Sequence, residues 1–365
     1  MTMAENKDEK VLNVPHLRFP EFSGEWEKYT IGDLCEEFKS GKNIKAESIQ
    51  EEGVYPVFGG NGLRGYTDRY NHDGDYVLIG RQGALCGNVR FVTGKTYITE
   101  HAIAAKATND NYTRYLEYLF VRLNLGQFSD QSAQPGLAVN KLLKIETYVP
   151  SKAEQLKIAF LLRLLDERIA TQNKIIEDLK KLKSAIAETV FNNMQGHLTS
   201  LSAICNIVKG KQVNGEELSE KGKYYVMNGG ITPSGYYDQC NTPANTISVS
   251  EGGNSCGYVQ YNKSSFWSGG HCYTLQDITS GVDTQYLFHY LKRYESNIMN
   301  LRIGTGLPNI QKKDLENFRI ALPPSNVQKE ISTCLTAIED KIMVEVKWLD
   351  STQKEKLYLL RQMFI

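Results

Sequence analysis

Two long segments of the chain carry apolar residues at a helical spacing. Residues 151–195 and 325–365 contain neither glycine nor proline, and their apolar positions recur at alternating intervals of four and three residues. This heptad spacing predicts a coiled coil whose contact seam is formed by the repeated apolar positions. The predicted seam residues are Ile158, Leu162, Leu165, Ile169, Ile176, Leu179, Ile331, Leu335, Ile338, Ile342, Leu349 and Leu359.

The two predicted helices match each other. Polar residues interrupt both seams at equivalent places, Gln172 with Glu345 and Lys183 with Lys356. Polar seam residues specify register and orientation, and a segment of about 40 residues far exceeds the mean helix of about 11–12. We therefore expect the two helices to pack as an antiparallel coiled coil with pseudo-two-fold symmetry, rather than each covering its own domain.

Further apolar residues lie off the seam, where a two-helix coil does not need them. They predict either a second stripe for a partner helix, as in a four-helix arrangement, or packing against the globular parts of the chain. Both interpretations stay open for these residues: Leu161, Leu164, Ile175, Leu182, Trp348, Leu357 and Leu360.

The rest of the chain is an internal repeat with an offset of 170 residues. Gly59-Gly60 returns as Gly229-Gly230, and Cys86-Gly87 returns as Cys256-Gly257. From Pro150, which matches Pro323, the offset is 173. The repeat predicts an internally duplicated α+β chain in four parts. They are an N-terminal tail with a first globular domain (1–150), a long helix (151–196), a second globular domain (197–324) and a second long helix (325–365).

The globular parts have the pattern of β-rich domains with short helices. Residues 76–80 and 246–250 predict equivalent strands, each followed by a glycine-rich loop, and residues 112–125 and 284–297 predict helices. The loops do not match a phosphate-binding motif. Their glycines agree between the copies while the residues among them differ, with Arg81 against Glu251. This is typical of one scaffold that carries two binding specificities.

Charge and cysteine usage narrow the class of protein. Lys and Arg total 42 and Asp and Glu total 42, so the net charge is zero. This excludes the class of strongly basic proteins that bind nucleic acid through their overall positive charge. Apolar residues make up 41% and charged residues 23%, with no run long enough for a membrane span. The seven cysteines include no CxxC pair, so we expect no metal site and reduced thiols in a cytoplasm.

No residue is predicted to be catalytic, because the hydrolase, metalloprotease, kinase and aminomethyltransferase motifs are all missing. His101 and His271 match in the repeat and invite a catalytic interpretation. However, the acidic neighbour Glu100 has Gly270 as its counterpart, so a structural or hydrogen-bonding role is favoured for both histidines.

Together these features resemble the specificity (S) subunits of Type I DNA restriction-modification systems. The resemblance covers about residues 12–365 and rests on the segment 14–22 with Trp26, on the strand and loop at 79–83, and on the helix starts near Gln155 and Gln328. The second copy departs from the pattern, with Glu251 at the place of Arg81 and Val327 at the place of Glu154.

The resemblance implies a non-catalytic subunit in which each globular unit, a target recognition domain, reads half of a bipartite, asymmetric site in double-stranded DNA. The helices would set the spacer and dock two methyltransferase (modification) subunits, and restriction (translocase/nuclease) subunits would join them. No cofactor is implied for this chain. S-adenosylmethionine, ATP and Mg would belong to the partners, and no membrane is involved.

Base edges are read by hydrogen-bonding side chains on loops, and phosphates are held by cations. These residue types define the candidate DNA contacts of both units, with Lys95 and Lys263 assigned to phosphates. They are Asn61, Arg64, Arg81, Gln82, Asn88, Lys95 and Gln134 in the first unit, and Asn228, Thr232, Ser234, Glu251, Asn254, Ser255, Lys263 and Arg302 in the second.

Two rival functions remain open. A scaffold with two ligand- or protein-binding β domains on a coiled-coil spacer suits the 21 tyrosines and the neutral charge. An enzyme in its own right is disfavoured by the missing motifs. Because phosphate neutralisation normally dominates DNA affinity, we expect the partner subunits to supply much of the charge and the isolated chain to bind DNA weakly.

Overall fold

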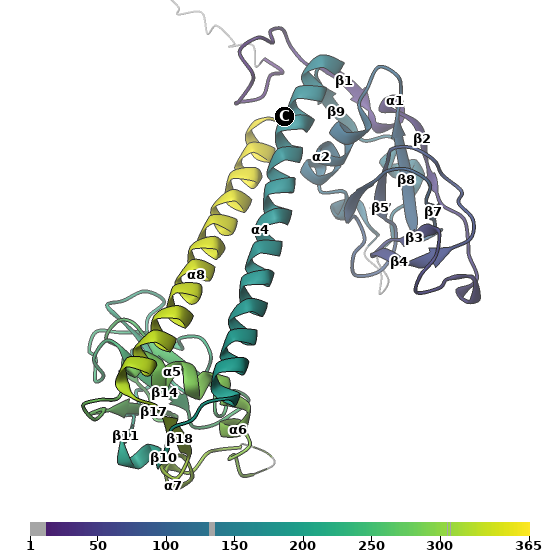
Figure 1. Ribbon diagram of the computed structural model, residues 1–365. Helices are drawn as coiled ribbons and strands as arrows, with labels where there is room; N and C mark the ends of the chain where they lie inside the picture. Colours follow the sequence, from purple (N-terminus) through teal and green to yellow (C-terminus); the bar gives the residue numbers. More distant parts are fainter. Residues whose placement is uncertain (1–11, 131–135, 305, 307) are drawn as a thin grey trace, which may run out of the picture. The chain divides into compact units, whose positions relative to one another are not determined.

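The computed structural model describes residues 12–130, 136–304, 306 and 308–365 (Figure 1). The chain folds into two compact units. The first contains residues up to Gln172 together with Trp348–Ile365, and the second contains Asn173–Lys347. Each long helix therefore contributes one part to each unit. Within the described residues, no helix combines the length and the apolar character needed to cross a membrane.

The first unit is built on a four-stranded antiparallel sheet in the order β2-β8-β5-β6. A three-stranded sheet, β4-β3-β7, and a two-stranded sheet, β1-β9, complete it. The strands are β1 (Glu27–Thr30), β2 (Cys35–Ser40), β3 (Tyr55–Gly59), β4 (Gly62–Thr67), β5 (Tyr76–Gly80), β6 (Val89–Val92), β7 (Tyr97–Ile98), β8 (Ala102–Ala107) and β9 (Glu146–Val149). The short helices are α1 (Ile31–Leu34), η1 (Ala46–Ser48), α2 (Thr113–Leu123), η2 (Leu125–Phe128) and α3 (Val139–Leu142).

The second unit repeats this topology strand for strand, with sheets β11-β17-β14-β15, β13-β12-β16 and β10-β18. Its strands are β10 (His197–Ser200), β11 (Asn206–Lys209), β12 (Tyr224–Met227), β13 (Gly235–Tyr237), β14 (Thr246–Ser250), β15 (Val259–Asn262), β16 (Trp267–Ser268), β17 (Cys272–Gln276) and β18 (Arg319–Leu322). Its short helices are η3 (Leu201–Ala203), η4 (Gly215–Glu217), α5 (Thr284–Arg293), α6 (Glu295–Met299) and α7 (Lys312–Glu316). The predicted duplication is confirmed.

The strands predicted at 76–80 and 246–250 are the central strands β5 and β14, and every residue in both is buried. Both faces of these strands are covered, which accounts for the nearly unbroken apolar sequence of β5. In β14, Ile247 and Val249 alternate with buried hydroxyl residues. The helices that follow are strongly amphipathic. The second is shorter than predicted, because α5 ends at Arg293 and α6 starts at Glu295.

The long helices are α4 (Lys152–Asn192) and α8 (Ser325–Gln362). Within the first unit, Lys356 of α8 pairs with Asp166 of α4, and Arg168 lies over the ring of Trp348. Within the second, Lys183 of α4 pairs with Glu339 of α8 at 3.2 Å. In the first unit the residue numbers rise along α4 as they fall along α8, so the predicted antiparallel pairing is confirmed.

The two matched seam lysines therefore have a clear role. Lys183 and Lys356 each reach an acidic residue on the facing helix, and these acids, Glu339 and Asp166, are themselves equivalent at the offset of 173. All the predicted apolar seam residues are buried or half-buried. The seam thus combines apolar burial with one ion pair in each unit, and such a pair fixes the register of a coiled coil.

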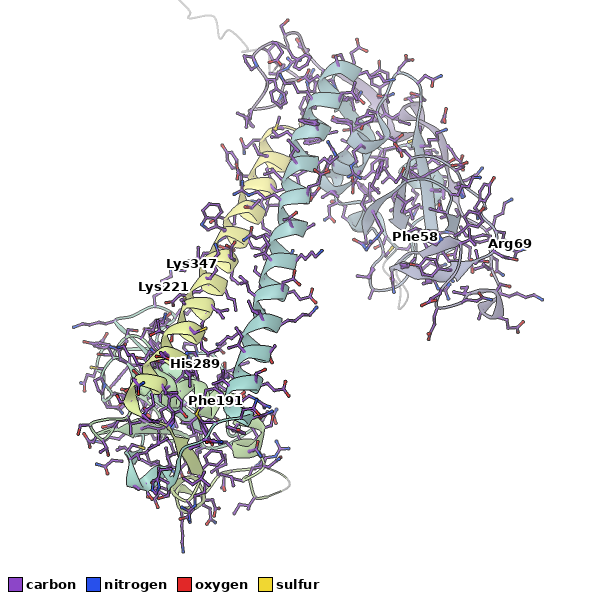
Figure 2. All side chains as sticks on the ribbon, viewed as in Figure 1. Phe58, Arg69, Phe191, Lys221, His289 and Lys347 are labelled. Carbon is purple, nitrogen blue, oxygen red and sulfur yellow. The ribbon has the colours of Figure 1, made fainter. Side chains whose placement is uncertain are left out.

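Each unit takes up the C-terminal end of a long helix in its core. Phe191 of α4 packs edge-on against Tyr286 and Tyr290 in the second unit, at ring-centroid distances of 5.8 and 5.4 Å. In the first unit Phe364, just after α8, stacks on Tyr115 at 5.4 Å. Figure 2 labels Phe191, which lies with His289 where α4 ends. These aromatic contacts join the end of α4 to α5 and the end of α8 to α2.

The first unit has an additional N-terminal strap, residues 13–26. Arg18 donates two hydrogen bonds of 2.8 Å to the carboxylate of Glu154, which is only 1% exposed. The backbone N–H of Leu17 donates to the carbonyl of Gln362, at the end of α8. The strap therefore contacts both long helices, and the charge of Glu154 is buried only together with that of Arg18.

Candidate nucleic-acid interface

The glycine-rich loops after β5 and β14 form the same turn. In both, the cysteine N–H bonds to the carbonyl of Gly83 or Gly253, and the cysteine Sγ bonds to the carbonyl of Arg81 or Glu251. Gly257 has a φ of 90°, and a Cβ there would lie 2.7 Å from the Cα of Met299. These glycines let the loop approach a helix closely, so the matched cysteines and glycines serve the scaffold.

The predicted contacts of the first unit lie on its loops and strand ends. Arg81 is half-buried at the start of the glycine loop, and the Oε1 atom of Gln82 accepts a hydrogen bond from Nδ1 of His101 at 3.1 Å. Gln134 lies outside the described residues. The remaining candidates are exposed, and they are Asn61, Arg64, Asn88 and Lys95.

In the second unit, the structure brings four predicted residues to one pocket of about 630 Å³. They are Asn228, Glu251, Asn254 and Ser255. Thr232, Ser234 and Arg302 are exposed but do not line this pocket. Lys263 is exposed as well, and its Nζ lies 2.8 Å from Asp340 of α8.

Glu251 differs from the exposed loop residue expected from the sequence, because it is only 8% exposed. Its Oε1 accepts from Lys209 Nζ at 2.6 Å and from the hydroxyl of Tyr273 at 3.1 Å. Burial together with this carboxylate raises the pKa of Tyr273. The Oε2 atom is buried without a hydrogen-bond partner among the described residues, 3.6 Å from Nδ1 of His271. Glu251 therefore lies behind two exposed donors.

Those two donors, Lys209 and His271, were not among the predicted contacts. Lys209 ends the edge strand β11, its side chain is 53% exposed, and it lines the pocket. His271 is 64% exposed and lines the pocket from the other side, with its backbone N–H held by Asn228. The histidine match had indicated a hydrogen-bonding role, whereas the repeat offset matches Lys209 with Lys39, and the structure does not keep that pairing.

The reason is a register shift in the first unit. The offset of 170 pairs Lys209 with Lys39, but β2 contains a bulge between Cys35 and Glu37. Ser40 lies opposite Ile103, just as Lys209 lies opposite Tyr273. The local offset is therefore 169, which corrects the uniform spacing expected from the sequence, and Ser40 is the counterpart of Lys209. Lys39 instead faces Glu37, at 3.1 Å.

Apolar side chains also remain exposed on the long helices. Of the off-seam residues, Leu161 and Leu360 pack on the core of the first unit. The other five are 38–56% exposed, namely Leu164, Ile175, Leu182, Trp348 and Leu357.

Each unit has a groove beside its long helix. In the first, a groove of about 590 Å³ is lined by Phe91, Leu156 and Phe160. In the second, a groove of about 760 Å³ is lined by Tyr261, the counterpart of Phe91, and by Phe288 and Met343. Exposed apolar patches of this kind are typical of interaction surfaces.

Similarities to known proteins agree with this architecture. The Type I restriction modification DNA specificity domain family matches residues 23–181 and 198–348. The specificity subunit of the Type I restriction enzyme EcoprrI of Escherichia coli is 38% identical over 180 residues, which cover 48% of this chain and 44% of that protein. A putative type I specificity subunit of Mycoplasma genitalium is 24% identical over 361 residues, covering 93% and 94%.

A solved structure shares the fold over almost the whole chain. The crystal structure of the S subunit of a Type I restriction-modification system from M. genitalium matches with a TM-score of 0.81. The match has 22% identity and covers 96% of this chain and 99% of that one. With two matched family segments, each containing one of the repeated globular parts, the chain belongs to the DNA specificity subunits of Type I restriction-modification systems.

Proposed function

We propose that the chain reads a bipartite, asymmetric site in double-stranded DNA, with one half-site read by each globular domain. The domains are those at 1–150 and 197–324, and the helices at 151–196 and 325–365 set the spacer. One observation supports this above all. The two units share a backbone topology and the loop glycines Gly83/Gly253 and Gly87/Gly257, yet carry different polar side chains around the loop. Base edges are distinguished by such side chains.

The candidate contacts divide by chemistry. Amide, hydroxyl and guanidinium groups on the loops suit base edges, whereas Lys95 suits a phosphate. Lys263 already forms an ion pair with Asp340. To bind a phosphate, Lys263 would have to exchange this carboxylate for the phosphate. We propose the predicted loop residues as DNA contacts as a group, not residue by residue.

The chain itself is proposed to be non-catalytic and to work in the cytoplasm, where its seven free thiols stay reduced. Two methyltransferase subunits would bind the exposed apolar residues and the grooves beside α4 and α8. Each unit has a groove beside a long helix, which suits two copies of one kind of partner. The methyltransferases would bring S-adenosylmethionine, and restriction subunits would bring ATP and Mg chemistry.

The test is sequencing of modified bases in host DNA with and without this gene. Loss of a single bipartite methyladenine motif on deletion is the expected result, and exchange of one globular domain should change only its own half of the motif. If no motif changes while the neighbouring methyltransferase is expressed, the proposal fails. The alternative of a non-DNA binding scaffold would then be favoured.

A further inference from the structure

The pocket of the second unit has an unusual charge arrangement. The carboxylate of Glu251 is buried at its floor, and the ammonium group of Lys209 and the ring of His271 stand in front of it. The other polar side chains that line it are those of Asn228, Asn254, Ser255 and Asn309. Because Gly229, Gly252 and Gly253 complete the lining, a flat ligand can approach the backbone closely.

Lys209 keeps free donors in this arrangement. Its ammonium group has three N–H donors, and the contacts made by described residues use one of them for Glu251 and none for a second acceptor. The carboxylate neutralises the charge of the ammonium group and holds it in place. The two remaining N–H donors of Lys209 are thus held in a fixed direction, and the charge of the group is neutralised. Such donors suit an uncharged ligand edge with two acceptors better than a phosphate, because phosphate binding depends on net positive charge.

In the major groove, guanine is the base that presents two acceptors on one edge, O6 and N7. We infer that Lys209 reads a guanine in the half-site of the second unit, and that Glu251 is a positioning residue that aims Lys209 without touching the base. This inference rests on the proposed function, since it assumes that the second unit reads DNA. It replaces the direct base contact expected for Glu251 from the sequence.

The first unit uses a different arrangement at the same place. Ser40 occupies the position of Lys209, and Arg81 occupies that of Glu251, with equivalent backbone hydrogen bonds from residues 81 and 251 to the carbonyls of His101 and His271. The cation is therefore supplied by the loop in the first unit and by the edge strand in the second. A change at Lys209 should consequently affect one half-site only.

The experiment uses the assembled complex of the full chain with its modification subunits. Initial rates of methyl transfer are measured on DNA duplexes in which each position of the second half-site is replaced by the other three base pairs. Wild type is expected to prefer guanine at one position by about 5- to 150-fold, which corresponds to one good base contact. Lys209→Ala should reduce that preference to near one and leave the preferences at the other positions unchanged.

Two further variants and a control sharpen the test. Lys209→Gln should move the preference at the same position toward adenine, because a glutamine amide suits its N6 and N7 atoms. Glu251→Gln should weaken the preference less than Lys209→Ala does. The matched control, Arg81→Ala, should alter positions of the first half-site only.

The outcomes separate the two proposals. If Lys209→Ala lowers the rate equally on all duplexes and keeps every preference, Lys209 contacts a phosphate and the inference is wrong. It is also wrong if both Lys209 variants keep the wild-type guanine preference. If the wild-type complex methylates all duplexes without regard to sequence in either half-site, the proposed function itself fails, whatever the variants do.

Discussion

The two units show how one scaffold can carry two different sites. Strand order, loop turn and glycine positions agree, and the cysteine Sγ bonds to the carbonyl of residue 81 or 251 in both. The charges around the turn differ, with Ser40 and Arg81 in one unit and Lys209 and Glu251 in the other. The backbone of a recognition loop can thus stay constant, because the hydrogen bonds and close contacts that stabilise it involve few of the side chains that face outward.

The same contrast holds where the long helices meet the domains. In the first unit the hydroxyl of Tyr118 donates to Asp166 at 2.8 Å, and Lys356 pairs with the same carboxylate. In the second, α5 aligns with α2 at an offset of 171, since Tyr115 and Tyr286 contact the matched residues Phe364 and Phe191. His289 therefore occupies the place of Tyr118, and it bonds to Thr336 at 2.9 Å. One junction is therefore ionic and partly exposed, and the other is a buried neutral contact. Four sets of variants test what these and related contacts contribute to stability.

The largest effect is expected for the helix ends that enter the cores. Phe191→Ala should destabilise the second unit by about 3–5 kcal/mol, because it leaves a cavity between Tyr286 and Tyr290. Phe364→Ala should have a similar effect on the first unit. Hydrogen exchange resolved by peptide would show the loss of protection in only the affected unit. Equal loss in both units would contradict the assignment of each aromatic residue to one core.

The next effect concerns the strap, which has no equivalent ion pair in the second unit, where Val327 stands at the place of Glu154. Arg18→Ala leaves the buried carboxylate of Glu154 uncompensated and should cost about 3 kcal/mol. Adding Glu154→Val, which imitates the second unit, should recover most of that loss. Chemical unfolding of the single and double variants measures both values, and an additive pair of losses would refute this account.

The third test uses pH. Burial, reinforced by the charge of Lys183, lowers the pKa of His289 from 6.5 to about 3, and only Asp283 opposes this shift. The histidine therefore binds a proton near pH 6.5 in the unfolded chain but only near pH 3 in the folded chain. The free energy of unfolding consequently falls as the pH drops from 6.5 toward 3. The slope from this group approaches about 1.4 kcal/mol per pH unit.

His289→Gln should remove that part of the pH dependence while keeping the contact with Thr336. Thermal unfolding of the second unit between pH 7 and pH 4 measures the difference. The matched control is Tyr118→Phe in the first unit, which should leave the slope of the second unit unchanged. An unchanged slope in His289→Gln would mean that the histidine is accessible to protons in the folded state.

The smallest effect is expected for the seam ion pairs, which are partly exposed. Replacing Lys183 or Lys356 by Met should change stability by only about 0.5–1 kcal/mol, because surface pairs contribute little. A double-mutant cycle of Lys183 with Glu339 isolates the pairwise energy. A coupling above about 2 kcal/mol would show that these lysines contribute far more to stability than to helix register.

The repeat, the two long helices and the central strands could be predicted from the sequence, because each depends on a pattern of residues along the chain. The spacing of apolar residues predicts a helix seam whatever the tertiary structure around it. An unbroken apolar run such as β5 predicts a strand covered on both faces. The split between α5 and α6 was not predicted, because apolar spacing continues through Tyr294, whose backbone leaves the helical conformation.

The sequence by itself determined the fold class, the family and the residues in which the two copies differ. Only the tertiary structure decided what these residues do. Burial of Glu251 depends on its place beside Tyr273 and Lys209, residues 22 and 42 positions away. The counterpart of Lys209 depends on one extra residue in a β-bulge. Spacing along a chain cannot report either feature, because strand register and the burial of a charge are set by partners that are distant in sequence.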